Sequence, residues 1–470
     1  MATKIPTEIL IKILNNFQST RDLHSSLLVN RIWCKVAIPM LWELTLCQEF
    51  LWWKKALCIR TYISCMDTQA RTLLIENGFD LSSSPPQAIF DYPSFTHKII
   101  IDNLFYFISI YSPQISPPQI NHNNYNNEIA MIKSRILFRE ICRLIINHCS
   151  FLDYFKLAVL DDFNSFPRNN SYLIDSILVL TGAPKVFRKL KSFTSMIGDH
   201  KSIYPLYESL SLICKNILKM DLNLFSNSQA QLLAKLISAQ KRLENLSIVT
   251  SDLHNLPDSI FWAIISQRVT LKSLRLYLNF CHFKGKASPF GQFISLQELY
   301  IKGWYGSNCL LLASSFTQLS TFHYFQSSHR YPHEFIIKIL ETANMNLKDI
   351  CLNLYSTITF DIFSAILNYC TNITELTLHS LSPELVIAIF NNNFNELRRL
   401  SFDCGWNWLI ADELLLQMAK NIPESLETIE ISRCDFISDN IRNFYKGWCC
   451  KGRGNKKIIV KSRSGVIEFI

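Results

Sequence analysis

The chain of 470 residues is too long for one compact hydrophobic core, so its length favours several domains or a stack of repeats. Apolar residues make up 49% and charged residues 18%, a composition that excludes a disordered chain. The net charge of +9 is modest and spread along the chain, apart from a basic tail at 446–463 that we interpret as a solvated terminal segment. We therefore expect no nucleic-acid partner.

The first eighteen residues predict one amphipathic helix. Pro6 stands where a first helical residue would be, because its missing N–H is unpaired there in any case. The apolar stripe of this helix consists of Ile5, Ile9, Leu10, Ile13, Leu14 and Phe17.

Two further short helices follow in the sequence. Ser19 to Asp22 has the S-x-x-D pattern of a capping box and predicts the start of the second helix. Residues 29–34 predict a third helix, which we expect Pro39 to end before an extended piece at residues 41–42. Three such helices cannot bury their apolar surface among themselves, so they pack either on the rest of this chain or on a partner.

Three strings follow one another in these first residues. They are Ile5-Pro6-x-Glu8-Ile9-Leu10-x-x-Ile13-Leu14, Leu27-Leu28-Val29-Asn30-Arg31-x-Trp33 and Pro39-x-Leu41-Trp42. In this order they resemble the F-box of fungal F-box proteins, although Ile-Pro replaces the usual Leu-Pro opening. The resemblance implies that residues 1–46 dock on the small adaptor subunit of a Skp–cullin–F-box ubiquitin ligase, and through it on a cullin. The contacts that it implies are Ile5, Pro6, Ile9, Leu10, Ile13, Leu14, Leu28, Val29 and Trp33.

A motif of the form L-x-x-L-x-L, with other apolar residues substituting, recurs in the rest of the chain. From Leu190 to Leu426 the ten starts are separated by 27, 26, 28, 25, 23, 28, 26, 24 and 29 residues. This spacing lies in the leucine-rich-repeat range of about 20–29 residues and is too regular for chance in a Leu-rich helical protein. A looser match starts at Leu152. The Asn or Cys typical after the last apolar position occurs clearly only at Asn279 and Cys434, so the repeat type is divergent.

Each motif predicts a short strand of a parallel sheet, and the segments between predict helices, for example at 335–342, 363–369 and 413–419. One repeat cannot bury its own apolar face, so neighbouring repeats must stack. We therefore predict an α/β fold: an F-box at 1–46 and a curved leucine-rich-repeat solenoid at 151–470, with strands on the concave face and helices on the convex face. Residues 47–150 are interpreted as divergent first repeats that join the two, with an exposed loop at 112–127.

The strand positions between apolar residues predict a target-binding face. One column reads Ser247, Arg275, Tyr300, Cys351, Thr377, Ser401 and Glu430. The adjacent column reads Val249, Tyr277, Lys302, Asn353, His379, Asp403 and Ser432. Arg275, Tyr277, Tyr300 and Lys302 are the predicted target contacts, because Arg and Tyr are enriched at binding hot spots and the two cations suit an acidic or phosphorylated segment. The alternatives are that these positions are ordinary solvated strand faces, or that the target binds the Asn-rich loop at 121–127.

The sequence does not predict an enzyme, a cofactor or a metal site. Gly447-x-x-x-x-Gly452-Arg453 has the spacing of a phosphate-binding loop without its Lys, and His333-Glu334 lacks the second His of a zinc protease. Cys142, His148 and Cys149 cluster without a fourth ligand at a sensible spacing.

The 15 cysteines contain no C-x-x-C pair, and no apolar run free of charges reaches the length of about 18 residues needed to span a membrane. Cysteines in apolar runs, at positions 142, 214, 351 and 370, are expected to be buried and free. No apolar signal segment opens the chain, so we expect a cytoplasmic or nuclear protein. Two functions remain open: a substrate-recognition subunit of a ubiquitin ligase, or a non-degradative repeat protein with a decayed F-box, which scaffolds partners or binds nucleic acid through its basic tail.

Overall fold

The computed structural model describes residues 5–17, 19–43, 52–81, 87–111, 124–158, 183–199, 201–250, 256–282, 293–305, 316–326, 333–354, 357–392, 394–403, 412–433, 438–449, 456–462 and 465–469. The chain divides into two compact units. The first comprises 1–221 and 239–241, and the second comprises 222–238 and 242–470. Within the described residues no helix has both the length and the apolar content that crossing a membrane requires.

The first unit opens with three short helices, α1 (Thr7–Asn15), α2 (Thr20–Ser26) and α3 (Arg31–Glu43). Ser19 caps α2 by accepting a hydrogen bond from the Arg21 N–H, as its sequence pattern predicted. A small core holds these helices together. It consists of the buried residues Leu10, Leu14, Leu23 and Ala37, with Phe17, Leu27, Trp33, Val36, Met40 and Leu41 packed around them.

The predicted end of the third helix is wrong. Pro39 lies inside α3, and the helix continues to Glu43 instead of giving way to an extended piece. A proline in a helix removes one backbone hydrogen bond, which costs about 3 kcal/mol or more. Met40 and Leu41 pack against the small core only while the helix continues, so their burial offsets that loss.

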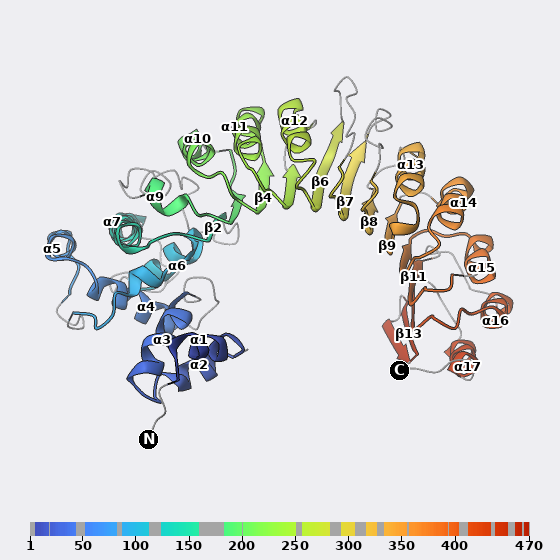
Figure 1. Ribbon diagram of the computed structural model, residues 1–470, viewed down its shortest axis with the longest axis horizontal. Coiled ribbons are helices and arrows are strands. Elements are labelled where there is room, and N and C mark those ends of the chain that lie inside the picture. Colours follow the sequence, from blue (N-terminus) through green and yellow to red (C-terminus); the bar gives the residue numbers. More distant parts are fainter. Residues whose placement is uncertain are drawn as a thin grey trace. The chain divides into compact units, whose positions relative to one another are not determined.

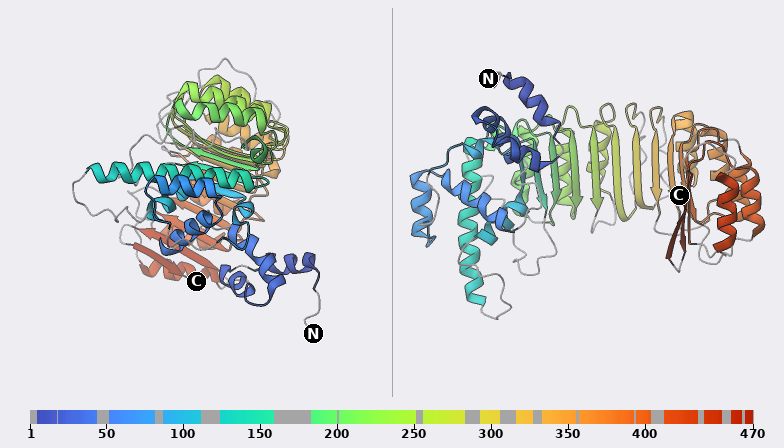
Figure 2. Two further views of the ribbon diagram at one scale, coloured as in Figure 1. Left: turned by 90° about the vertical axis from the view of Figure 1, so that its left-hand side faces the viewer. Right: turned by 90° about the horizontal axis from the view of Figure 1, so that it is seen from below.

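The described strands form one fourteen-stranded sheet in which the spatial order is the sequence order. The strands are β1 (Lys98–Ile100), β2 (Tyr154–Ala158), β3 (Ser192–Met196), β4 (Lys219–Leu224), β5 (Asn245–Thr250), β6 (Ser273–His282), β7 (Glu298–Tyr305), β8 (Thr321–Phe325), β9 (Asp349–Asn353), β10 (Glu375–Leu378), β11 (Arg399–Asp403), β12 (Thr428–Ser432), β13 (Lys457–Ser462) and β14 (Gly465–Phe469). The first thirteen form a parallel sheet, and β14 turns back antiparallel to β13. Figure 2 shows the strands of the second unit side by side in one orientation.

The sequence motif and the strand keep the same phase in every repeat from β2 to β12. Counting the first apolar residue of L-x-x-L-x-L as position 1, each strand begins at position 3. The backbone explains this phase: the carbonyl of position 2 accepts N–H groups from positions 2 and 3 of the next repeat, as Lys348 does from Thr374 at 2.8 Å and Glu375 at 2.9 Å. The same pair of bonds joins Asp153 to the turn at Lys191. Register is thus set by the turn and by the buried positions 1, 4 and 6.

Helices alternate with the strands. They are α4 (Trp52–Ser64), α5 (Thr68–Glu76), α6 (Ile101–Tyr111), α7 (Asn124–His148), α9 (Ala183–Phe187), α10 (Tyr204–Ile213), α11 (Asn227–Ser238), α12 (Asp258–Ser266), α13 (His333–Ala343), α14 (Phe360–Tyr369), α15 (Pro383–Asn391), α16 (Asp412–Lys420) and α17 (Ser438–Cys449), with short 3-10 turns at η1 (Tyr92–Phe95), η2 (Lys201–Ile203) and η4 (Asn344–Asn346). In the second unit the helices cover one side of the sheet and leave the strands on the inner side of a curved stack (Figure 1). This confirms the predicted leucine-rich-repeat architecture.

Two segments differ from their predicted structure. Residues 124–127 form the first turn of α7 and not a loop, because α7 continues as one long helix to His148; the rest of the predicted loop, 112–123, lies outside the described residues. The basic tail begins in the last turn of α17 and contains β13, which is the last parallel strand of the sheet. Ile458 and Val460 are buried in this strand. The sequence did not indicate the strand, because these apolar residues stand among Lys and Arg.

Candidate binding surfaces

The three N-terminal helices leave a group of apolar side chains exposed. Ile5, Ile9, Leu28 and Val29 are 38%, 46%, 84% and 56% exposed, and Pro6 is exposed beside them. Ile11 and Ile32, which the sequence comparison with the F-box pattern missed, are exposed as well. The remaining predicted contacts are less exposed. Leu10 and Leu14 lie in the core, while Ile13 and Trp33 are half-buried. Leu10 and Leu14 therefore position the helix and offer no surface to a partner.

The end of α3 is attached to the rest of the first unit. The Trp42 indole N–H donates to the Tyr62 hydroxyl at 3.1 Å, and its ring lies 4.5 Å from the ring of Tyr92. Glu43 pairs with Lys98, the first residue of β1, at 2.9 Å. The alternative that these helices pack on the rest of the chain is thus confirmed for the end of α3, while α1 and the turn after α2 keep apolar side chains exposed.

The predicted target contacts lie together on β6 and β7. Arg275 is opposite Tyr300, and Tyr277 is opposite Lys302, in the parallel register of these strands. The predicted columns omitted β8, whose register places His323 beside Tyr300 and Phe325 beside Lys302. In that repeat Phe322 and Tyr324 replace the usual leucines at positions 4 and 6, so His323 and Phe325 stand at positions 5 and 7. The motif was therefore sufficient to place both residues on this face.

Four rings make a continuous row on this face, which we call the aromatic row: Tyr277, Tyr300, His323 and Phe325. The Tyr300 ring centroid lies 4.9 Å from Tyr277, 5.1 Å from Phe325 and 6.0 Å from His323. All four rings are half-buried, so each keeps an accessible part. Burial raises the pKa of the Tyr300 hydroxyl, which therefore stays protonated near neutral pH and can donate a hydrogen bond.

The charges around the aromatic row are partly compensated. Arg275 Nη2 lies 3.3 Å from Glu298 Oε2, and that oxygen also accepts from the Ser273 hydroxyl at 2.8 Å. His323 Nε2 lies 2.9 Å from Asp349 Oδ2. Among the described residues, Lys302 is exposed and has no ion pair. The face thus offers aromatic surface with one free cation, and less positive charge than the sequence predicted.

Further along the sheet, the Asp403 side chain holds the turn that follows β10. Its side chain is 1% exposed; Oδ2 lies 2.6 Å from His379 Nδ1, and Oδ1 accepts the Ser380 N–H at 2.9 Å. Ser380 has a positive φ of 59°, an unfavourable conformation that this hydrogen bond stabilises. Burial acts to raise the pKa of Asp403, but the bonds from His379 and Ser380 outweigh it and lower that pKa.

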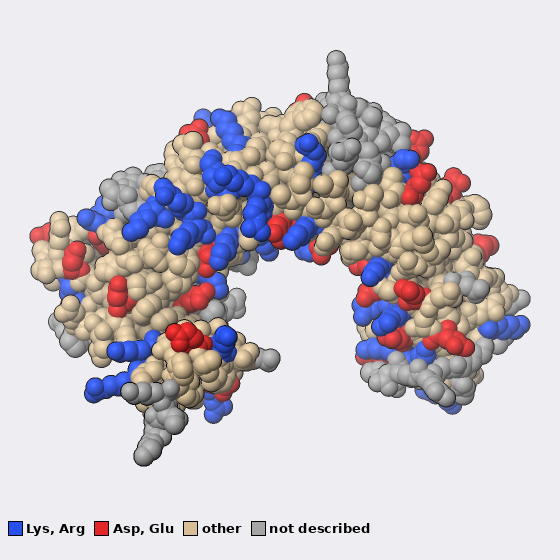
Figure 3. Space-filling model, in the orientation of Figure 1, with Lys and Arg blue, Asp and Glu red and all other residues tan. Residues whose placement is uncertain are grey.

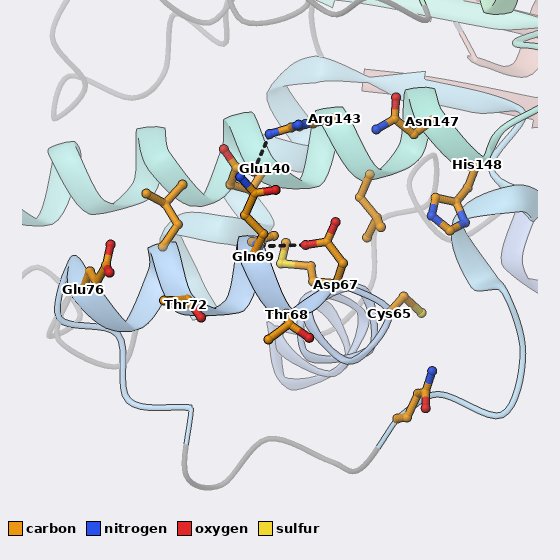
Figure 4. Close-up of a pocket in the computed structure, with 15 residues that line it drawn as sticks. Cys65, Asp67, Thr68, Gln69, Thr72, Glu76, Glu140, Arg143, Asn147 and His148 are labelled. Atoms are coloured by element: carbon orange, nitrogen blue, oxygen red, sulfur yellow. Dashed lines mark hydrogen bonds and ion pairs between the residues drawn. The ribbon is translucent and has the colours of Figure 1, made fainter.

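A groove of about 800 Å³ lies in the first unit between α5 and α7 (Figure 4). Several charged side chains line it, and two of the lining residues, Glu140 and His148, have charged partners. Glu140, nearly buried, lies 3.2 Å from Arg139 Nε and 4.0 Å from Arg143 Nη1, and His148 lies 2.8 Å from Asp91. In the part of the chain that the structure describes, no three His, Cys, Asp or Glu side chains are arranged to hold a metal ion.

The described residues of the partial enzyme motifs lie in or at the ends of helices of the fold. Gly447 lies inside α17, where its N–H takes part in a helix and not in a phosphate loop. His333 opens α13, and its Nδ1 lies 3.2 Å from the Thr359 hydroxyl. Cys142, Cys214, Cys351 and Cys370 are free and buried, which confirms their predicted role as small apolar residues. Burial raises the pKa of Cys214, Cys351 and Cys370 to about 12, so these thiols are poor nucleophiles.

No protein-family model matches the chain, and no curated protein matches it. Among solved structures, it is similar to the leucine-rich repeat-containing protein LegL7 from Legionella pneumophila, at 15% identity over 67% of this chain and 92% of that one, with a TM-score of 0.34. The assignment rests on the chain's own geometry: strands at a constant phase of an L-x-x-L-x-L motif, in sequence order, alternating with helices. The chain therefore has a leucine-rich-repeat fold, in which stacked repeats share one continuous sheet.

Proposed function

We propose that this protein is the substrate-recognition subunit of a Skp–cullin–F-box ubiquitin ligase. The N-terminal helices bind the adaptor subunit, and the strand face of the second unit binds a target protein. The protein then works by raising the effective concentration of target lysines near the ubiquitin-loaded enzyme, without acid–base chemistry of its own.

The observation that carries this proposal is the exposed apolar surface of α1 and the turn after α2. Ile9 and Leu28 belong to the strings that resemble an F-box, yet the small core does not use them. Burying one such side chain contributes about 1.5–3 kcal/mol, part of which association costs offset. An adaptor subunit that covers this surface accounts for side chains that a helix of a free monomer would not need.

Adaptor binding is tested by co-purification of the full chain with the adaptor subunit. The variant Ile9→Asp with Leu28→Asp places two charges on the exposed surface and leaves the buried Leu10 and Leu14 in place. We expect this variant to lose the adaptor, because a buried unpaired carboxylate is strongly unfavourable at an interface. Thermal unfolding of the variant should match that of the wild type.

The matched control is Ile75→Asp with Leu212→Asp, which changes two exposed apolar residues on α5 and α10 by the same charge. It should retain the adaptor. Failure of the wild-type chain to bind adaptor in a clean reconstitution would end the ligase proposal and leave the non-degradative scaffold.

The target-binding part of the proposal rests on the aromatic row and the cation beside it. Aromatic side chains and Arg dominate binding hot spots, whereas ion pairs at an exposed rim contribute little. We therefore expect Tyr300→Ala to weaken target binding more than Arg275→Glu with Lys302→Glu, since Glu298 already compensates Arg275.

Targets are first captured by affinity purification with the proteasome inhibited and identified by mass spectrometry. Recovery with each variant is then compared in chains that still bind adaptor. Unchanged recovery with both variants would show that the target binds elsewhere on the chain.

A further inference from the structure

Seven cationic residues gather where helices lead into strands in the first unit. We call this group the basic ridge: Lys185, Arg188, Lys189, Lys191, Lys215, Lys219 and Lys241. Six of them are exposed, and Lys215 is half-buried. Figure 3 shows Lys and Arg side chains concentrated on this part of the unit, where Asp and Glu are sparse.

The backbone of the sheet places these turns next to one another. The Lys191 N–H donates to the Asp153 carbonyl at 3.0 Å, and the Lys219 N–H donates to the Lys191 carbonyl at 3.0 Å. In the same way the Lys241 N–H donates to the Lys215 carbonyl at 2.9 Å. Adjacent strands lie about 4.8 Å apart, so the cations form a line that runs across the strands and not a scattered surface.

Few carboxylates in the described residues compensate this line. Asp153 pairs with Lys191 at 3.0 Å, and Asp221 pairs with Lys219 at 3.4 Å. Lys215 donates to the Ser211 carbonyl, which leaves its positive charge uncompensated. Arg188 and Lys241 have no ion pair with the described residues. A row of like charges repels itself, so an anionic partner stabilises it.

We propose that the basic ridge docks an acidic segment of a protein partner, a run of Asp and Glu in extended conformation. Asp153 and Asp221 are already paired with Lys191 and Lys219, so within the described residues the ridge keeps unpaired cations at Arg188 and Lys241 for the carboxylates of such a segment. Six of the seven residues are Lys, which act as point charges and lack the planar fork that suits Arg to phosphate and base recognition. This proposal is independent of the ligase proposal.

The aromatic residue beside the ridge also favours a peptide over a nucleic acid. Phe151 is stacked on His97 with ring centroids 4.4 Å apart, and the Lys189 ammonium lies 5.0 Å from the same ring. His97 thus covers one face of the ring, and Lys189 contacts it as well, which leaves less of it for stacking on a base of a single-stranded nucleic acid.

The test measures binding of a fluorescein-labelled oligoglutamate peptide to the full chain by fluorescence anisotropy at several salt concentrations. We expect saturable binding that weakens as salt rises. Arg188→Glu with Lys241→Glu should weaken binding by about tenfold or more, because two attractive charges become repulsive. The control Lys235→Glu with Lys348→Glu changes the net charge equally at exposed positions of the second unit, and Lys348 occupies the same kind of turn. It should bind the peptide like the wild type.

Several outcomes would overturn the proposal. These are no binding of oligoglutamate by the wild type, and equal weakening by the ridge and control variants. Labelled oligothymidylate and vesicles containing phosphatidylserine are measured in parallel. Tighter ridge-dependent binding of either probe would assign the ridge to a nucleic acid or to a lipid surface instead. Unchanged thermal unfolding of the ridge variant ensures that a loss of binding reports on charge.

Discussion

The three N-terminal helices and the repeats of the second unit handle apolar surface in opposite ways. Around the small helical core, residues such as Ile9 and Leu28 remain exposed. In the repeats, the apolar positions of each motif are almost completely buried, as at Ile373, Leu376 and Leu378. Stacked repeats bury one another's faces, whereas three short helices cannot. Exposed apolar surface therefore indicates a partner site in the helices, while in the repeats recognition must use polar and aromatic strand positions.

The two regions also differ in how they satisfy backbone polar groups. Exposed side chains cap the N-terminal helices: the Asn30 side-chain oxygen accepts the N–H groups of Ile32 at 2.9 Å and Trp33 at 3.0 Å. In the repeats, buried side chains make the hydrogen bonds to the backbone. Gln240 bonds one N–H and one carbonyl group, and Asp403 accepts the N–H of a turn. Water can replace the first kind of partner but not the second, so equivalent substitutions should differ in cost.

The largest effect is expected from one buried leucine in each region. Leu14→Ala and Leu376→Ala should each destabilise by about 2–5 kcal/mol, because each leaves a cavity in a packed core. Hydrogen exchange followed by mass spectrometry should locate the damage. For Leu14→Ala we expect lost protection in α1–α3 together with lost adaptor binding. For Leu376→Ala we expect it in β9, β10 and β11, because neighbouring repeats share their stability. Protection lost uniformly in both variants would contradict this division.

The sequence predicted the repeats better than the ends. The strands β5 and β11 followed from the motifs that start at Leu243 and Leu397, because each repeat meets the same neighbours and the local pattern decides its structure. The continuation of α3 through Pro39 could not be predicted, since it depends on contacts of Met40 and Leu41 with other helices. β1 was missed because it has only three residues, and β13 because its apolar residues lie among lysines.

The candidate surfaces followed the same rule. Arg275 and Tyr300 were placed side by side correctly, because register in a repeat follows from counting. The ion pair of Arg275 with Glu298 was missed, because the columns read from the sequence contained positions 5 and 7 and omitted position 3. Which F-box-like residues are core and which are exposed also could not be read from spacing, since Ile9 and Leu10 lie in the same apolar stripe.

A smaller effect, dependent on pH, is expected at Asp403. The pKa of this carboxyl is lowered in the folded state, so its contribution to stability is complete above the usual aspartate pKa of about 4. That contribution is lost as pH falls through the folded-state value. Asp403→Asn should cost about 1.5–3 kcal/mol at neutral pH, the value of hydrogen bonds to a charged group, and much less in acid.

Urea unfolding of wild type and Asp403→Asn between about pH 7 and about pH 3 measures this difference. Glu430→Gln is the matched control, since the Glu430 carboxylate pairs with Lys461 on the strand face and is not buried. A constant gap between wild type and Asp403→Asn at all pH values would show that the charge of Asp403 does not stabilise the turn.

Gln240 should have a similar or slightly smaller effect that does not depend on pH. Its side chain accepts the Ile217 N–H at 2.9 Å and donates to the Cys214 carbonyl at 2.9 Å, and the residue is 5% exposed. Gln240→Leu keeps the volume but leaves two buried backbone groups unpaired, which costs about 1–3 kcal/mol. Urea unfolding at neutral pH checks the value, with Gln297→Leu as a control at an exposed position. Equal stability of the two variants would mean that the buried groups find other partners.

The smallest effect is expected at the exposed helix cap Asn30. Asn30→Ala removes the acceptor for the first N–H groups of α3, but water reaches these groups, so we expect a loss of about 0.5–1 kcal/mol, at the low end for caps. Asn30→Ser keeps a capping oxygen and should restore most of it. Hydrogen exchange in α3 reports the change, because global unfolding can be insensitive to so small a unit. A loss as large as that of Gln240→Leu would show that α3 depends on its cap more than on Trp33, Met40 and Leu41 packed against the small core.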